Sequence, residues 1–306
     1  MRCSSFLPAA IALALAGCSS DLPPAAGLVT GSNPDASAAF QAARQAEDSG
    51  RSGQAIKLYK KFGEQYPWAD EAAEARYRQA QLLQNSGETV KAFDAYQELI
   101  TRYRGSNLYN KALETQAQLA QSAADGEIKT SFLGMKSKLS SEKVVGMLTK
   151  VRENAPAAPS ASRAQFGIGE LYQSRGDANK AIAAYRELVR DFPDSREAAE
   201  GQYRIGVILT EQAERGNQDQ ANIDTAREAL QDYLQRYPGH AKNGEARQRI
   251  STLGSRDIQR SYDVAEFYRK KGETESAKFY YREVLRLAGS GETHDQAKAR
   301  LAELGE

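Results

Sequence analysis

The sequence has few of the residues that build metal sites, disulfide frameworks or nucleic-acid-binding surfaces. Its 306 residues include two Cys and two His, too few for the usual ligand sets of zinc or for a disulfide-rich fold. Lys and Arg (41) balance Asp and Glu (40), so the basic excess typical of nucleic-acid-binding proteins is missing. The hydrophobic fraction of 41% argues against a wholly disordered chain. We therefore expect no metal, no cofactor and no nucleic-acid partner.

The apolar run near the amino terminus is too short to cross a bilayer. It covers residues 6–16 (FLPAAIALALA), which is 11 residues, whereas a spanning helix needs about 20. With Arg2 before it, the run has the form of a secretory signal peptide. The Leu-Ala-Gly-Cys sequence ending at Cys18 resembles a bacterial lipobox, which implies cleavage before Cys18 and its acylation. The alternative is an ordinary signal peptide with a chance Cys behind it.

The lipobox divides the chain into three parts. Residues 1–17 are the predicted signal peptide, 18–35 an acylated Cys with a Pro/Gly/Ser-rich flexible tether, and 36–306 the folded domain. Several acyl chains satisfy the requirement that stable anchoring takes more than one lipid. Ser19, and not Asp, follows the Cys. The enteric sorting rule then implies the outer membrane, with the folded domain facing the periplasm.

A recurring phrase fills the rest of the chain. It has Ala, then an aromatic residue or Leu four positions later, then Pro eight positions further on. The clear copies are Ala55–Tyr59–Pro67, Ala181–Tyr185–Pro193 and Ala226–Leu230–Pro238, and the weaker ones are Ala92–Tyr96–Arg104, Val144–Leu148–Pro156 and Ala277–Tyr281–Gly289. Four copies have Gly five residues before the Ala (Gly50, Gly87, Gly176, Gly272) and a small residue twelve before it (Ala43, Ala80, Gly169, Ala265).

This spacing predicts two amphipathic helices per unit, joined by a turn. Gly ends helix A, Pro stops helix B, and the small residues let the two helices approach closely. One pair cannot bury its apolar face alone, so neighbouring pairs must stack. The pattern is that of tetratricopeptide repeats, with a base period of 37 residues, read from Ala55 to Ala92. We predict an all-α fold, a right-handed α-solenoid of about six helix pairs.

Three intervals between the phrases are longer than the base period. Glu127–Lys143 is inserted between the helices of the third pair, as a hinge between two halves of the array or as a binding element. A polar loop is predicted near residues 215–224. The last helix A is expected to start early, near Ala241.

The sequence contains no pattern typical of catalysis. His240 and His294 lack the partners of a metal motif, and the carboxylates are scattered along helix faces beside Lys and Arg. Gly167-Ile-Gly169 lies in a helical pattern with no strand before it, so it is interpreted as a packing feature. We predict no catalytic residues, no enzymatic activity and no small-molecule substrate.

The aromatic residues fall into two groups. The Tyr residues of the repeat phrase are predicted core. A second group lies three positions before the small residue of helix A, where tetratricopeptide arrays present their concave face. The candidates for holding an extended peptide are Phe40, Tyr77, Phe166 and Tyr203, together with Arg44, Gln81 and Gln84. The alternative is that these rings only cover the groove floor.

The carboxy-terminal third carries the sharpest likeness to a known family. Residues 261–272 (SYDVAEFYRKKG) resemble the final repeat of the BamD/YfiO outer-membrane lipoproteins. The matching residues are Tyr262, Val264, Ala265, Glu266, Phe267, Tyr268 and Gly272. The chain departs from the family in having about six repeats instead of five, in the insert of residues 132–143, and in Arg286-Leu-Ala-Gly289 where Tyr-Pro usually stands.

The resemblance implies a periplasmic scaffold of the β-barrel assembly machinery. Its N-terminal groove would receive unfolded outer-membrane proteins. Its C-terminal half, with Tyr262, Glu266, Phe267 and Tyr268 in the partner region, would hold the barrel subunit. The alternative is a general cell-envelope scaffold of the Tol–Pal-associated or pilus-assembly type.

Overall fold

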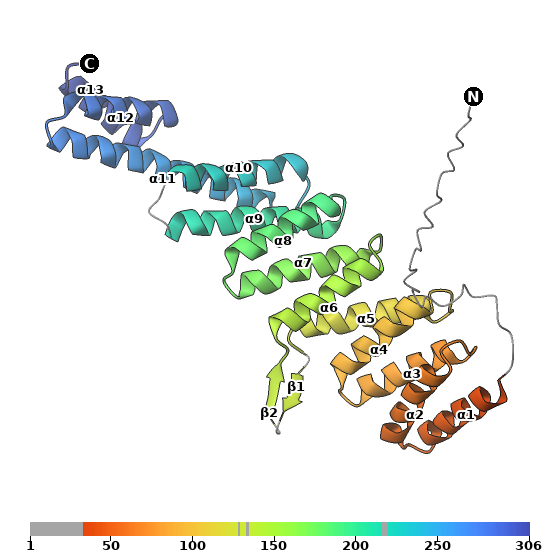
Figure 1. The fold of residues 1–306 in the computed structure, drawn as a ribbon. Coiled ribbons are helices and arrows are strands. Elements are labelled where there is room, and N and C mark those ends of the chain that lie inside the picture. Colours follow the sequence, from red (N-terminus) through yellow and green to blue (C-terminus); the bar gives the residue numbers. More distant parts are fainter. Residues whose placement is uncertain (1–32, 128, 133–134, 216–219) are drawn as a thin grey trace, which may run out of the picture. The chain divides into compact units, whose positions relative to one another are not determined.

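The computed structural model describes residues 33–306, apart from residues 128, 133–134 and 216–219. Over these residues it contains thirteen α-helices and one two-stranded sheet (Figure 1). The predicted all-α fold is confirmed, and a small β-hairpin is added to it. Cys18, the predicted signal peptide and the tether up to residue 32 lie outside the described residues.

Twelve of the helices form six successive pairs, as the repeat phrase predicts. Their bounds are α1 (Pro34–Asp48) and α2 (Ser52–Gln65), α3 (Ala72–Asn85) and α4 (Thr89–Arg102), α5 (Tyr109–Ala124) and α6 (Ser141–Asn154), α7 (Pro159–Ser174) and α8 (Ala178–Asp191), α9 (Arg196–Arg215) and α10 (Gln220–Arg236), and α11 (Asn243–Lys270) and α12 (Thr274–Leu287). Helix α13 (Glu292–Glu303) follows the last pair.

Glycine residues lie in the turns between paired helices, and proline residues follow the ends of the second helices, as predicted. The four predicted turn glycines, Gly50, Gly87, Gly176 and Gly272, all have positive φ, between 71° and 79°, a region that residues with a Cβ adopt reluctantly. Gly126, with φ 74°, does the same for the third pair. Each Pro of the phrase stands two residues after the last residue of its helix B, for example Pro193 after α8, where it cannot interrupt the helical hydrogen bonds.

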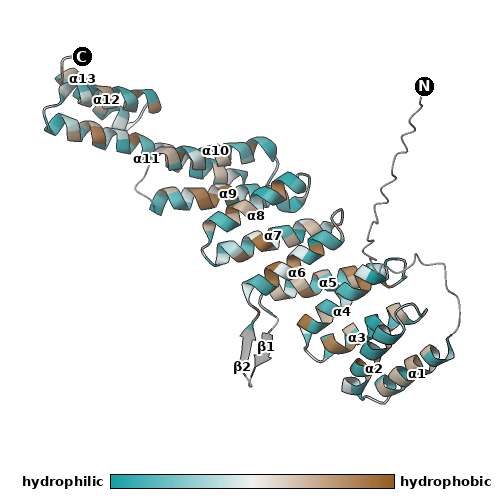
Figure 2. Cartoon of the chain, in the orientation of Figure 1, coloured by the Kyte–Doolittle hydropathy of each residue, from teal (hydrophilic) through white to brown (hydrophobic). Residues whose placement is uncertain are grey.

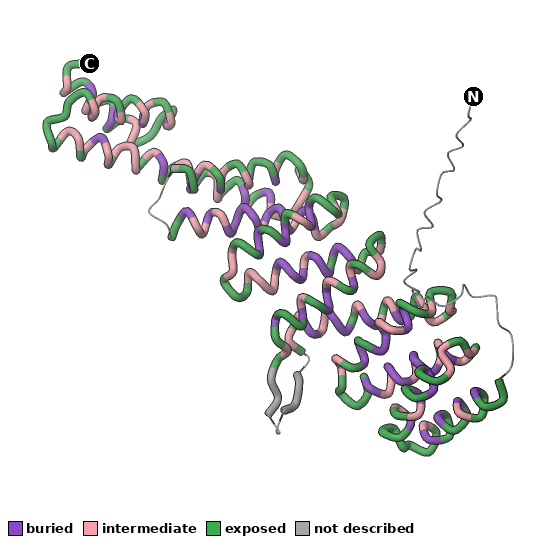
Figure 3. The backbone as a smooth tube through the Cα atoms, viewed as in Figure 1, coloured by how far each residue is buried: buried purple, intermediate pink, exposed green. Residues whose placement is uncertain are grey.

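The repeat phrase itself forms the core. Its Ala residues are fully buried, and so are Tyr59, Tyr96, Tyr185, Tyr281 and Leu230. Figure 3 shows buried and exposed residues alternating along the helices, which is the pattern of amphipathic helices that bury one face. The prediction that the phrase tyrosines are core residues is confirmed.

Two glycines set the closest helix contacts. A Cβ on Gly169 of α7 would lie 2.4 Å from Cε1 of Tyr185 in α8, and a Cβ on Gly206 of α9 would lie 2.4 Å from Cδ2 of Leu230 in α10. Real Cβ atoms do not approach other atoms so closely, so only Gly lets each helix A lie this near its helix B. The interpretation of Gly167-Ile-Gly169 as a packing feature is confirmed.

The chain divides into two compact units, which we describe separately. Unit 1 is Met1–Gly87 with Asp94–Ala112, described here from residue 33, and unit 2 is Glu88–Phe93 with Leu113–Glu306. In unit 1 the core joins α1, α2 and α3 around Phe40, Tyr59 and Phe62. In unit 2, successive helices from α6 to α13 pack on one another.

Polar and apolar residues alternate along the helices (Figure 2). None of the described helices is long and apolar enough to span a membrane.

The insert of the third pair contains the hairpin. Strands β1 (Lys129–Phe132) and β2 (Met135–Lys138) are antiparallel, with Lys129 opposite Lys138 and Phe132 opposite Met135. The insert stands between α5 and α6 as predicted. Its role as a hinge or as a binding element stays a prediction.

Two other predictions concern helix length. Helix α11 starts at Asn243 and runs for 28 residues, which agrees with the expected early start near Ala241. Of the polar loop expected at residues 215–224, Arg215 belongs to α9, Gln220 begins α10, and residues 216–219 lie outside the described residues.

Candidate protein-binding surfaces

In unit 1, the two aromatic residues predicted to hold a peptide, Phe40 of α1 and Tyr77 of α3, belong to the core. Phe40 packs against Tyr59 and Phe62, with ring centroids 5.9 and 5.5 Å apart, and Tyr77 packs against Tyr96 at 5.7 Å. Both candidates are buried. A ligand could therefore reach no more than the edges of these rings.

The polar candidates of unit 1 remain accessible. Arg44 of α1 and Gln84 of α3 are exposed, and Gln81 is half-buried. Gln84 accepts a hydrogen bond from the Tyr96 hydroxyl at 3.3 Å, and this bond holds its side chain near the helix end. These polar groups can form hydrogen bonds with a peptide, whereas the rings of Phe40 and Tyr77 are buried in the core.

In unit 2, the predicted peptide-binding rings of Phe166 and Tyr203 also pack against tyrosines of the core. Phe166 is half-buried with its ring 5.6 Å from that of Tyr185, and Tyr203 is buried with its ring 5.5 Å from that of Tyr233. Burial raises the pKa of Tyr203 to about 12. Lys242 lies over the Tyr203 ring at 5.7 Å, a cation–π contact. The peptide-binding role of all seven predicted residues stays a prediction.

The phrase tyrosines tie helix B to helix A by a repeated hydrogen bond. The hydroxyls of Tyr59, Tyr96 and Tyr185 each donate to a side chain twelve residues earlier, namely Glu47 at 2.6 Å, Gln84 at 3.3 Å and Gln173 at 2.9 Å. Burial raises the pKa of each of these phenols well above its ordinary value, so they stay protonated donors. This contact was not predicted, although the twelve-residue spacing to an acceptor in the sequence indicates it.

A second set of buried polar side chains was also missed. Arg76 in α3, Gln116 in α5 and Gln165 in α7 are all buried. The guanidinium of Arg76 donates to Gln79 at 2.9 Å and pairs with Glu98 at 2.9 Å, and the amide of Gln165 donates to the Ala184 carbonyl at 2.9 Å. Buried polar groups need such partners, so these residues act in packing and not in ligand contact.

In the family motif of α11, Glu266 holds the last three helices together. Its carboxylate accepts from Arg269 at 2.8 Å, pairs with Arg300 of α13 at 3.3 Å and accepts from the Tyr281 hydroxyl of α12. The Arg269 guanidinium, more than any other neighbour, lowers the pKa of Glu266 to about 2. Tyr262 packs edge-on against Tyr281 at 5.7 Å. These two motif residues therefore support the fold of the terminal repeat.

The other two motif residues belong to an exposed aromatic patch. We define this patch as Phe267, Tyr268, Phe279 and Tyr280, from α11 and α12. Tyr268 and Tyr280 stack at 5.6 Å, Phe267 contacts Tyr268 at 5.5 Å, and Phe279 contacts Tyr280 at 5.2 Å. Phe267 and Phe279 are 52% and 61% exposed, and Lys271 lies 4.5 Å over the Phe267 ring. Clustered exposed aromatic residues mark protein-binding surfaces.

The patch was only half predicted. Phe267 and Tyr268 were identified through the family motif, whereas Phe279 and Tyr280 were missed. Their signal is the run of three aromatic residues at 279–281: a helix can bury only part of such a run against one partner, so Tyr281 enters the core and the other two stay near the surface.

Side chains able to ligate a metal ion do not cluster in the described residues. No three His, Cys, Asp or Glu side chains are placed there to hold a metal ion. His240 lies with Nδ1 2.6 Å from the Tyr233 hydroxyl and is half-buried. His294 is bonded to Asp295 at 3.0 Å.

Comparison with known proteins points to one family. A family model described as YfiO, outer membrane lipoprotein, matches residues 135–295, just over half of the 306-residue chain. A tetratricopeptide repeat model matches residues 74–106, which cover most of α3 and all of α4. No curated protein matches the sequence.

Solved structures resemble the chain at low sequence identity. A TPR repeats protein from Bacteroides fragilis is 13% identical, covering 73% of this chain and 99% of its own, with a TM-score of 0.46. Pseudomonas aeruginosa pilF is 13% identical, covering 87% of this chain and 98% of its own, with a TM-score of 0.32. A tetratricopeptide repeat protein from Parabacteroides merdae is also 13% identical, covering 90% of this chain and 100% of its own, with a TM-score of 0.32.

Proposed function

Because the chain belongs to the YfiO family of outer membrane lipoproteins, we propose that it is a lipid-anchored scaffold of the outer-membrane β-barrel assembly machinery. It is a tetratricopeptide-type lipoprotein of the cell envelope. The proposal is that its folded domain faces the periplasm, binds the barrel-assembly subunit and unfolded outer-membrane proteins, and catalyses no reaction.

The aromatic patch is the observation that carries the proposal. It lies within the residues matched by the family model, and two of its four rings are more than half exposed. Aromatic side chains supply much of the binding energy at interfaces because they bury a large area with little loss of side-chain freedom. Hydrogen bonds and an ion pair of Glu266 link α11 to α12 and α13, and α11 and α12 carry the patch. A preorganised surface of this kind suits a folded partner, here the barrel subunit.

A different surface is proposed for unfolded clients. Arg44 and Gln84 of unit 1 present exposed polar groups, whereas Phe40 and Tyr77 are buried. An extended chain has unpaired backbone groups, and polar side chains on a rigid helix can bond to them without sequence specificity. Gln81 would extend this surface along α3.

The test compares paired substitutions with a matched control. Phe267→Ser together with Phe279→Ser removes both exposed rings of the patch, and Trp68→Ser removes a ring that is 51% exposed in unit 1. All three positions are accessible, so the fold should be kept. We expect the double variant to lose recovery of the barrel subunit in a pull-down and to lower the levels of outer-membrane barrels in cells, whereas Trp68→Ser keeps both.

Two results would remove the proposal. One is a wild-type pull-down without the barrel subunit, together with unchanged barrel levels after depletion of the protein. The other is recovery of peptidoglycan-linked or pilus components in its place, which would assign the chain to a general envelope scaffold.

The lipid anchor is tested separately at Cys18. With Cys18→Ala, we expect no palmitate labelling and no cleavage before residue 18, because the chain then lacks the residue that carries the acyl groups. A Cys18→Ala protein that is still processed and stays membrane-bound would contradict the lipoprotein prediction.

A further inference from the structure

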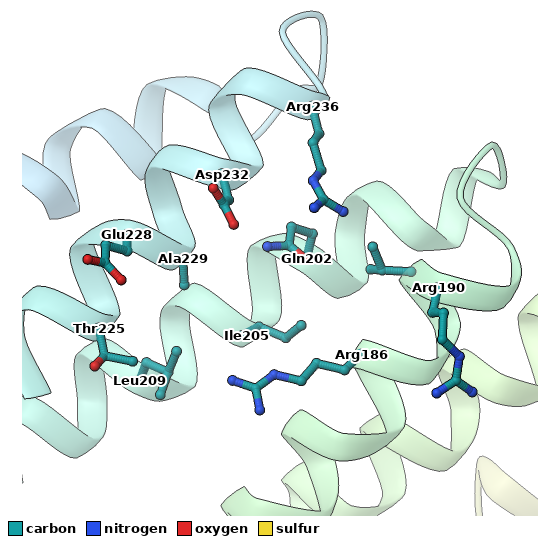
Figure 4. A pocket seen from close by; sticks show the side chains of 11 residues that line it. Arg186, Arg190, Gln202, Ile205, Leu209, Thr225, Glu228, Ala229, Asp232 and Arg236 are labelled. Atoms are coloured by element: carbon teal, nitrogen blue, oxygen red, sulfur yellow. The ribbon is translucent and has the colours of Figure 1, made fainter.

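An open groove lies between α8 and α10 of unit 2, over α9 (Figure 4). Its volume is about 440 Å³, within the range of about 300–1,000 Å³ typical of ligand-binding clefts. Ile205 and Leu209 of α9 form an apolar floor, and Ala229 of α10 adjoins them. The groove shares no lining residue with the aromatic patch, so it is a separate surface.

The two walls of the groove carry opposite charges. On the α8 side, Arg186 points into the groove, and on the α10 side Glu228 and Asp232 do so, with Arg236 at the end of the wall (Figure 4). All four side chains are exposed, and none forms a salt bridge within the part of the chain that the structure describes. In contrast, Arg190, which also lines the groove, pairs with Asp191 at 2.7 Å.

The unpaired charges of the groove contrast with paired charges elsewhere on the helix faces, such as Glu200 with Arg204 at 2.8 Å. Four uncompensated charges beside an apolar floor leave both kinds of interaction available to a partner. Complementary charges across an interface set which partner binds and in which register.

The groove favours a helical ligand over an extended one. Its walls and floor are α-helices, whose backbone groups are already bonded within each helix. An extended ligand would place its own N–H and C=O groups over Ile205 and Leu209 without partners, which is costly. A helical ligand satisfies its backbone internally and can lay an apolar ridge into the groove.

We propose that the α8–α10 groove binds an amphipathic α-helix of a partner protein, whose apolar ridge is flanked by acidic residues on one edge and basic residues on the other. The acidic edge faces Arg186, and the basic edge faces Glu228 and Asp232. The apolar ridge covers Ile205 and Leu209. This inference does not depend on the proposed function, since it rests on a different surface.

The experiment uses the folded full-length chain without its signal peptide and three labelled helical peptides. Each peptide has about 18 residues, enough to hold a helix in water, and the same Leu ridge. One carries Glu on one edge and Lys on the other, one carries Glu on both edges, and one carries Lys on both. Binding is measured by fluorescence anisotropy at low salt, where exposed charges act most strongly.

Wild-type protein should bind the mixed peptide about tenfold more tightly than either single-sign peptide. Glu228→Lys with Asp232→Lys makes both walls basic, so this variant should instead prefer the peptide with Glu on both edges. A gain of affinity for that peptide cannot arise from misfolding. The control is Glu153→Lys with Glu273→Lys, an equal charge change at exposed sites outside the groove, and it should keep the wild-type preference.

Three binding results would overturn the inference, and a fourth outcome concerns dimers of the chain. They are no saturable binding of any peptide, an unchanged preference in the Glu228→Lys/Asp232→Lys variant, or an equal switch in the control. If the mixed peptide binds only by dissociating a dimer of the chain, the groove belongs to a second copy and the partner-helix proposal fails.

Discussion

Replacing Gly169 by Ala adds one methyl group at the closest contact between α7 and α8. The new Cβ would lie 2.4 Å from Cε1 and 2.8 Å from Cζ of Tyr185. That ring cannot simply move away, because it is fully buried and its hydroxyl donates to Gln173 at 2.9 Å. The substitution therefore forces apart two helices of one repeat.

Two opposing effects determine the size of the loss. Overpacking a core by one or two methyl groups costs about 1–3 kcal/mol. Ala in place of Gly in a helix interior gains about 1 kcal/mol. The net expectation is a loss of up to about 2 kcal/mol in the free energy of unfolding relative to wild type, and of about 1–3 kcal/mol relative to a Gly→Ala change without the clash.

Gly146 supplies the matched control. It also lies inside a helix, α6, but nothing is within 4 Å of the position that its Cβ would take. Gly146→Ala should therefore show only the helical gain, up to about 1 kcal/mol. Both variants are compared with wild type by urea unfolding monitored by circular dichroism, with the slope m checked because repeat arrays need not unfold in two states. A Gly169→Ala protein as stable as Gly146→Ala would refute the role assigned to the glycine.

Three further substitutions test the core, a buried ion pair and a carboxylate. Ala181→Asp puts an unpaired charge at a fully buried site and should cost several kcal/mol in urea unfolding, so an unchanged midpoint would reject the repeat register. Glu98→Ala strips Arg76, only 4% exposed, of its ion pair and should cost about 2–4 kcal/mol, whereas Glu64→Ala breaks an exposed pair and should change the midpoint little. Because the folded-state pKa of Glu266 is lowered from 4.5 to about 2, its stabilising contribution is complete above about pH 4.5 and is lost as the pH falls toward 2. Glu266→Gln should flatten that part of the curve of melting temperature against pH, and an unaltered curve would contradict the assignment.

The repeat phrase predicted the fold well because local geometry determines it. Turn glycines, helix-stopping prolines and buried alanines act within one helix pair, so their spacing in the sequence is their spacing in the structure. Gly206 escaped detection because helix α9 is longer than the other early A helices, which moves its glycine away from the expected offset to Ala226. The hairpin at β1 and β2 escaped because it lies outside the repeated pattern.

The candidate surfaces were harder to predict than the fold. Whether Phe40 or Phe267 is exposed depends on which neighbouring helix covers that face, and periodicity does not specify the neighbour. The α8–α10 groove combines side chains from two repeats, as with Arg186 and Glu228. No single repeat contains the groove, so a search one motif at a time cannot find it.

Helix α11 makes the carboxy-terminal end behave as one cooperative block. Ala246 and Leu253, in its first half, lie in the core shared with α9 and α10, whereas Ala265, in its second half, lies in the core shared with α12 and α13. The helix is 28 residues long, about 42 Å at 1.5 Å per residue, and no break separates the halves. In a regular array the last repeat frays by itself. Here, opening the terminal repeat disturbs the helix that closes the preceding core, so amide protons around the aromatic patch should exchange with solvent as slowly as those of α10.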